Sequence, residues 1–238
     1  MDTKLTGKTR IESDLIGARE IPAEALYGVQ TLRGIENFSI SKFRLSEYPL
    51  FIKGLAITKM AAAMANFELG LLTVEQKDAI IAACGEILDG KHHDQFPVDM
   101  IQGGAGTTTN MNANEVIANR ALELMGYERG EYQYCSPNDH VNCSQSTNDA
   151  YPTAIHIGMY FKHLQLLPHL EELIASFRKK GEEFSQIIKM GRTQLEDAVP
   201  MTLGQTFNGF ASILQDEIAH LNEAASLQPF LHLRSSLS

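Results

Sequence analysis

The stretch Ser144-Gln145-Ser146-Thr147-Asn148-Asp149 joins a polar loop to the longest apolar-periodic segment of the chain, which runs from about Ala150 to Phe177. Ser, Thr, Asn and Asp side chains accept hydrogen bonds from the free N–H groups at a helix start. The same N–H groups, together with the positive end of the helix dipole, can hold an anion. The residue types alone favour a plain helix cap, and anion binding is the second interpretation that they leave open.

The composition is that of a soluble globular protein with one large or two modest domains. The chain has 238 residues, of which 44% are hydrophobic and 21% charged. Its net charge of −9 argues against a nucleic-acid surface, which would need a basic patch. No apolar run approaches 18 residues, so we expect no membrane span. Cys84, Cys135 and Cys143 lack metal-ligand spacing, and we interpret them as reduced thiols in a cytoplasmic protein.

The hydrophobic periodicity predicts a mainly α fold. We expect short strands and loops over residues 1–50 and a helix from Phe51 on which Ile57, Met60, Ala61, Met64 and Leu71 follow the helical period. Thr73 and Gln76 fit a capping box for a second helix, whose buried stripe is Ile80, Ala83, Ile87 and Leu88. A third helix is predicted over about 112–125, with Ile117, Ala121, Leu124 and Met125 directed inward.

The second half of the chain predicts two long antiparallel helices, as in half of a helix bundle. Pro168 is expected to kink or break the first of them. A loop with several donors is predicted over 191–200, before the second helix. The resulting domain prediction is a mixed, mostly helical N-terminal domain (1–143), an incomplete central bundle (144–225) and an irregular tail (226–238).

Two polar clusters need a chemical interpretation. His92-His93-Asp94 has no further ligand at matched spacing, so a solvated turn is favoured over a metal site. The glycine-rich stretch from Gln102 to Asn110 lacks the Gly-Lys-Ser/Thr of a P-loop. A tight turn that caps a helix explains this second cluster about as well as an anion site does.

Four ordered blocks together resemble the aspartase/fumarase superfamily of lyases, over residues from about 9 to 225. These blocks are Tyr27 to Arg33, Gly103-Gly104-Ala105-Gly106-Thr107 through Glu115, Ser144 to Asp149, and Gly191-Arg192-Thr193-Gln194 through Gln205. The aspartate ammonia-lyase branch is most similar, because Ser146-Thr147-Asn148 has Thr where class II fumarases typically have Ser. Gln194 stands where fumarases, and some aspartases, have His.

The resemblance implies a reversible anti-elimination that converts L-aspartate into fumarate and ammonia. It assigns Thr107, Ser146 and Thr147 as hydroxyl donors to a carboxylate, Asn148 as an orienting group near the substrate amino group, and Thr193 and Gln194 as contacts to the β-carboxylate. No organic cofactor is implied. Some family members are activated by a divalent cation, for which this sequence shows no ligand set. The family also implies a homotetramer whose sites combine segments from three subunits.

Three features depart from the family pattern. Glu196 replaces the usual Gln and Thr206 the usual Glu, and both adjoin the site. The family's catalytic base is a serine in a Gly-Ser-Ser-x-x-Pro-x-Lys-x-Asn-Pro loop, a motif that these 238 residues do not contain. We therefore expect a truncated sequence that binds a dicarboxylate without turning it over. A class II fumarase and a non-catalytic binding or assembly module are the two alternatives.

Overall fold

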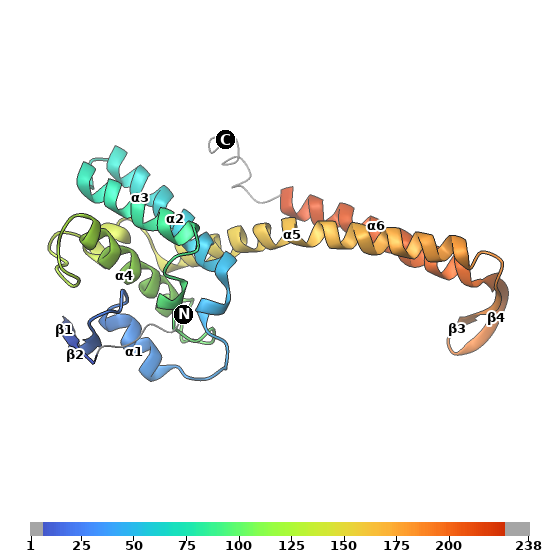
Figure 1. Ribbon diagram of the computed structural model, residues 1–238, viewed down its shortest axis with the longest axis horizontal. Coiled ribbons are helices and arrows are strands. Elements are labelled where there is room, and N and C mark those ends of the chain that lie inside the picture. Colours follow the sequence, from blue (N-terminus) through green and yellow to red (C-terminus); the bar gives the residue numbers. More distant parts are fainter. Residues whose placement is uncertain (1–6, 227–238) are drawn as a thin grey trace. The chain divides into compact units, whose positions relative to one another are not determined.

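The computed structural model describes residues 7–226 and confirms the mainly α fold (Figure 1). Its α-helices are α1 (Val29–Asn37), α2 (Pro49–Glu68), α3 (Val74–Leu88), α4 (Thr107–Leu124), α5 (Thr147–Glu183) and α6 (Leu203–Ser226). Two antiparallel hairpins supply the strands: β1 (Thr9–Asp14) with β2 (Gly17–Pro22), and β3 (Ile188–Thr193) with β4 (Glu196–Thr202). Shorter helical turns are η1 (Leu45–Glu47), η2 (His93–Gln95) and the π-helical η3 (Pro137–Val141).

The chain forms two compact units that divide inside α5, between Met159 and Tyr160. Each unit has its own apolar cluster, so each is described by itself. The domain limits predicted at 143/144 and 225/226 stay predictions, and the predicted tail lies almost entirely outside the described residues.

In the first unit, α2, α3 and α4 pack around one apolar core. The Thr73–Gln76 capping box begins α3, as predicted, and Ile80, Ala83 and Ile87 are buried. The stripe predicted for α2 was wrong: Met64 is half exposed and Leu71 lies past the end of the helix, which instead buries the face that carries Ile52, Leu55, Ala56 and Ala63. Because α2 is apolar almost all round, its period does not identify the buried side.

Helix α2 is long and apolar enough to cross a membrane, judged by length and composition. Its most apolar window is 44% buried within the protein, however. Two of its inward side chains, Lys59 and Asn66, donate hydrogen bonds to the segment that follows η3. These contacts and the burial identify α2 as a core helix of the first unit.

Helix α4 begins at Thr107, five residues earlier than predicted, and its inward face is buried over most of its length. Thr109 and Asn110 are buried inside its first turn, so the threonine-rich run is helix and not loop. Leu124, predicted inward, is 42% exposed.

In the second unit, α6 runs antiparallel to the later part of α5 (Figure 1). Phe177 packs against Phe207 and Phe210, while Arg178 reaches Gln215 and His163 reaches Asn222. The predicted antiparallel pair is therefore present. Two details were wrong: residues 191–200 belong to the β3–β4 hairpin, and Pro168 does not break α5. One missing backbone donor removes a single i→i−4 bond, which a 37-residue helix tolerates.

Candidate functional site

A glycine turn precedes α4 and forms one side of the site. Gly104 and Gly106 have φ values of +74° and +88°, in the left-handed region that favours glycine. A Cβ on Gly106 would lie 2.3–2.5 Å from ring carbons of Tyr151 in α5. Gly106 therefore serves two purposes: it permits the turn, and it lets the first turns of α5 pack directly against the loop.

The start of α5 forms the other side. The Ser146 hydroxyl accepts a hydrogen bond from the Asn148 N–H at 3.2 Å, and the Asp149 carboxylate accepts one from the Ser146 N–H at 3.1 Å. These bonds confirm the predicted helix cap. Ser146 and Asn148 remain exposed, whereas Thr147 is half-buried. Capping thus leaves polar groups of the same stretch accessible to a ligand.

The two sides border a cavity of about 560 Å³. Its lining comprises Met100, Ile101, Gln102, Gly104, Ala105 and Gly106 from the loop, and Asn148, Tyr151 and Pro152 from α5. Of the predicted site residues, Asn148 lines the cavity itself. Thr107 is the exposed first residue of α4, directly after the lining loop, and Thr147 precedes Asn148 on α5.

A buried polar network contacts Thr147 through Asn110. Asn110 Nδ2 donates to Thr147 Oγ1 at 3.2 Å and to Asn142 Oδ1 at 3.1 Å. Lys59 Nζ donates to Asn142 Oδ1 at 2.9 Å and to Gln145 Oε1 at 3.0 Å. The sequence pattern pointed to neither Lys59 nor Asn142. Lys59 shares a helical face with Ile52, Leu55 and Ala63, but α2 is apolar almost all round, so its period did not mark that face as the buried one.

Thr193 and Gln194 lie in the second unit, at the tip of the β3–β4 hairpin. Both are exposed, and Gln194 and the following Leu195 have positive φ values of +48° and +69°. The hairpin presents these side chains to solvent. The described residues thus place Thr107, Ser146, Thr147 and Asn148 in one unit and Thr193 and Gln194 in the other.

The donors at the cavity are chemically neutral. Hydroxyl, amide and backbone N–H groups can hold a carboxylate without neutralising its charge. Within residues 7–226, no group of three or more His, Cys, Asp or Glu side chains could hold a metal ion. His92-His93-Asp94 forms a turn with His92 at φ +62°.

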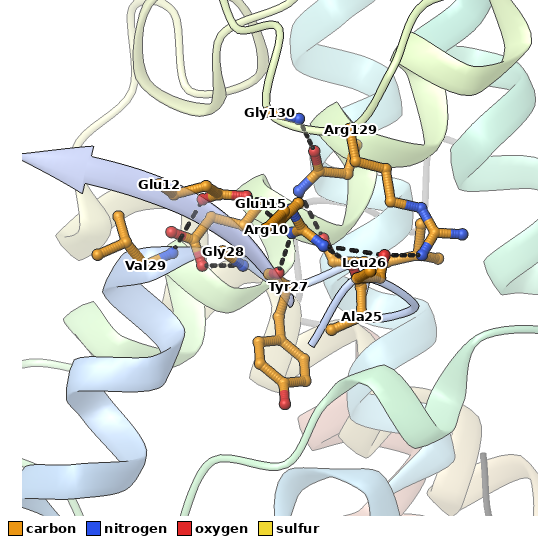
Figure 2. Close-up of polar contacts among 12 residues, drawn as sticks. Arg10, Glu12, Ala25, Leu26, Tyr27, Gly28, Val29, Glu115, Arg129 and Gly130 are labelled. Atoms are coloured by element: carbon orange, nitrogen blue, oxygen red, sulfur yellow. Dashed lines mark hydrogen bonds and ion pairs between the residues drawn. The ribbon is translucent and has the colours of Figure 1, made fainter. Parts of the chain in front are cut away.

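The second half of the Gly103–Glu115 block supports the fold. Glu115 is 2% exposed and accepts a hydrogen bond from the Gly28 N–H (Figure 2). It also accepts from the backbone N–H groups of Gln30 and Thr31 and from the Thr31 hydroxyl. Glu12 accepts from the Val29 N–H and from Arg10. Two carboxylates thus satisfy the free N–H groups at the start of α1. Burial raises the pKa of Glu115, and its donors act in the opposite direction.

A larger cavity of about 690 Å³ lies elsewhere in the first unit, lined in part by His92, Arg120, Glu123 and Arg129. Its arginines are engaged: Arg120 pairs with Glu86 and Glu123, and Arg129 pairs with Glu123. The Arg120 hydrogen bonds lower the pKa of Glu86 to about 2. An ion-pair network with its charges mutually satisfied is a weaker ligand site than the cavity beside Asn148.

The fold and the smaller cavity define a mainly helical protein that presents neutral polar donors where a glycine turn meets a helix start. The chain belongs to the Lyase family, whose sequence profile matches residues 17–233. It is 54% identical over 224 residues to the aspartate ammonia-lyase of Escherichia coli (strain K12), covering 94% of this chain and 47% of that protein. The chain thus spans about half the length of the curated relatives it matches.

Solved structures agree with this assignment. The chain matches the crystal structure of a fumarate lyase:delta crystallin from Brucella melitensis bound to cobalt with a TM-score of 0.88 and 53% identity, covering 93% of this chain and 48% of that one. It matches a class II fumarase from Schistosoma mansoni with a TM-score of 0.80 and 39% identity, covering 89% and 44%. The fold expected from the sequence blocks is therefore that of solved superfamily members.

Proposed function

We propose that this chain carries part of the substrate site of an aspartate ammonia-lyase, an enzyme that converts L-aspartate reversibly into fumarate and ammonia. The stretch Ser146-Thr147-Asn148 at the start of α5 is called the wall of this site below. The supporting relatives carry that name, and Asn148 of the Ser146-Thr147-Asn148 stretch lines a cavity beside the glycine turn. We further propose a cytoplasmic homotetramer whose ligand is a small dicarboxylate. Family membership supports this proposal.

The observation that carries the proposal is the state of the Thr147 hydroxyl. Asn110 donates to its oxygen, and among residues 7–226 no acceptor receives its hydrogen. A threonine hydroxyl has one hydrogen to donate, so this one remains available to a ligand oxygen. Asn110 is 1% exposed, and its contacts fix it within α4. The network therefore prepares Thr147 as a donor before any ligand arrives.

Such donors suit the chemistry of the elimination. Removal of the Cβ proton places negative charge on the β-carboxylate and gives an enediolate. Donors that already point at those oxygens stabilise this charge, and removal of one such donor typically lowers the rate by about 10²–10³-fold. In the proposal, Thr193 and Gln194 contact the β-carboxylate, Thr107, Ser146 and Thr147 donate to a carboxylate, and Asn148 lies near the amino group.

A class II fumarase is the second candidate, and the Schistosoma mansoni structure favours it. That reaction would release water from malate instead of ammonia from aspartate. Thr147 and Gln194 argue against it, because class II fumarases typically have Ser and His at these positions. The two candidates use the same wall and differ in the group that leaves.

A chimera separates these candidates. The residues of this chain replace the matching 224 residues of the Escherichia coli relative, and fumarate formation is measured from L-aspartate and from L-malate. We expect turnover of aspartate. Turnover of malate alone supports the fumarase, and a folded tetrameric chimera that converts neither substrate refutes the proposal.

Thr147→Val in that chimera tests the wall directly. We expect turnover to fall about 100-fold, because the substitution removes the hydroxyl and preserves its shape. Thr58→Val is the matched control, since the Thr58 hydroxyl only donates back to the Gly54 carbonyl within α2. Equal activities of the two variants would show that Thr147 is not part of the substrate site.

A further inference from the structure

Lys59 is a fully buried ammonium group that has no carboxylate partner. Its side chain is 0% exposed, in the middle of α2. Nζ donates to two neutral amide oxygens, Asn142 Oδ1 and Gln145 Oε1. None of the ion pairs among residues 7–226 includes it. Burying a charge without a counter-ion costs free energy, so a lysine at this position requires an explanation beyond packing.

The described groups that contact Lys59 or interact with its charge are not anions. The Cys84 thiol on α3 is neutral at physiological pH, because burial raises its pKa to about 12. Asn142 and Gln145 contribute neutral amide oxygens, and Asn142 is held in turn by the Asn110 amide on α4. His140 in η3 is occupied by the Ser136 N–H and the Gln76 side chain.

This environment leaves the charge state of Lys59 adjustable near neutral pH. Burial lowers the Lys59 pKa to about 7, so the neutral and charged forms are comparably populated. A nearby negative charge would favour the charged form. The described residues supply no such negative charge to Lys59, so a bound anion would have to bring it.

The contacts of Lys59 lead to the proposed wall. Asn142 Oδ1 receives hydrogen bonds from both Lys59 and Asn110, and Asn110 also donates to Thr147 Oγ1. Following these three contacts, Lys59 Nζ is at most about 9 Å from the Thr147 hydroxyl oxygen. An ammonium at that distance, inside low-dielectric protein, interacts appreciably with an anion at the wall.

We propose that Lys59 is the buried counter-charge for the dicarboxylate at the Thr147 wall, a positioning residue whose protonated fraction rises when the ligand enters. This inference rests on the proposed function. The wall itself offers neutral donors, and the chain carries a net charge of −9, so a dianion needs a local positive charge. Lys59 supplies that charge through Asn142 and Asn110, without touching the ligand.

A purely structural role makes a different prediction. Lys59 could serve only to hold residues 142–145 in place, through the same two hydrogen bonds. In that case its protonation would not respond to a ligand. Coupling between ligand binding and Lys59 protonation therefore separates the two roles.

The experiment uses the full 238-residue chain with ¹³C-labelled lysine and follows the Lys59 side-chain signal, assigned by its loss in Lys59→Arg, as a function of pH. Succinate, an unreactive dicarboxylate, is the probe. We expect saturating succinate to raise the titration midpoint of Lys59 by about one pH unit, from Coulomb attraction over on the order of 10 Å at an effective dielectric constant of about 20. The exposed Lys91 is the internal control and should not move.

The outcomes are distinguishable. A constant Lys59 midpoint, with succinate still shifting the amide signals of Ser146 to Asn148, overturns the inference and leaves the proposed function standing. Amide signals that succinate does not shift at all contradict the proposed function and the inference together. As a second measurement, Lys59→Met should weaken succinate binding about tenfold at pH 6 and less at pH 8. An equal loss at both pH values would indicate a structural role alone.

Discussion

Replacing Glu115 by Ala should destabilise the first unit more than any surface substitution, because one carboxylate satisfies four donors at the start of α1. The Gly28 and Gln30 N–H groups lie 2.8 Å from its oxygens, and the Thr31 N–H lies at 3.0 Å. The Thr31 hydroxyl donates to the same group at 2.5 Å. Glu115 comes from α4, so these bonds also attach α1 to the core helix.

The magnitude follows from what the substitution leaves behind. Each buried donor without an acceptor costs about 1–3 kcal/mol, and water that enters the vacated space recovers part of this cost. We therefore expect a loss of about 3–5 kcal/mol, the range typical for removing one side of a buried charged contact. Glu115→Gln keeps one acceptor oxygen and should lose about half as much.

Tyrosine fluorescence during urea unfolding measures this loss. The chain has no Trp, and all of its seven Tyr residues except Tyr160 lie in the first unit. Glu36→Ala is the control, because Glu36 is exposed and pairs with Arg19 only at 3.7 Å, and it should change stability by less than about 0.5 kcal/mol. If Glu115→Ala lost less than about 1 kcal/mol, the assigned role of the carboxylate would be wrong.

Three further substitutions test other parts of the fold. Gly106→Ala should lower the free energy of unfolding by about 2–4 kcal/mol, because the residue has φ +88° and its Cβ would meet the Tyr151 ring. Urea unfolding measures this loss, and a loss below about 1 kcal/mol would contradict the close approach of Gly106 to Tyr151. Glu86→Gln should cost about 1–2 kcal/mol at pH 7, because the pair of Glu86 with Arg120 is lost. The difference from wild type should shrink as pH falls from about 4.5 to 2, where the folded-state carboxylate takes up its proton, and a difference undiminished at pH 2 would exclude the Arg120 pair as its cause. Gly204→Ala should lower the thermal midpoint of the second unit, since its Cβ would lie 2.3 Å from the Gly181 carbonyl oxygen, and an unchanged midpoint would show that α5 and α6 are packed less tightly.

The helices could be predicted where a local signal was specific. Thr73 and Gln76 mark the start of α3 because their hydrogen bonds are made within four residues. The cap at Ser146 was found for the same reason. The buried face of α2 could not be chosen, because apolar residues surround the helix and only the packing of α3 and α4 decides which side is covered.

The site could be predicted only in part. The structure brings Asn148 and the glycine turn to one cavity, and their part in binding stays a prediction. The contact of Lys59 with Asn142 could not be predicted, because the two residues are 83 positions apart and no short-range pattern reports it. The β3–β4 hairpin was mistaken for a loop because β4 is exposed over most of its length, so its sequence lacks the alternation that marks a half-buried strand.

The most direct test of the proposed wall is an amide-resolved titration of the chain with fumarate. The account predicts that the signals of Gly104, Gly106 and the stretch from Ser146 to Asn148 shift first and saturate together, because these residues border the cavity at the start of α5. Signals that move instead around Arg120 and Arg129, while those of Ser146 to Asn148 stay constant, would contradict it.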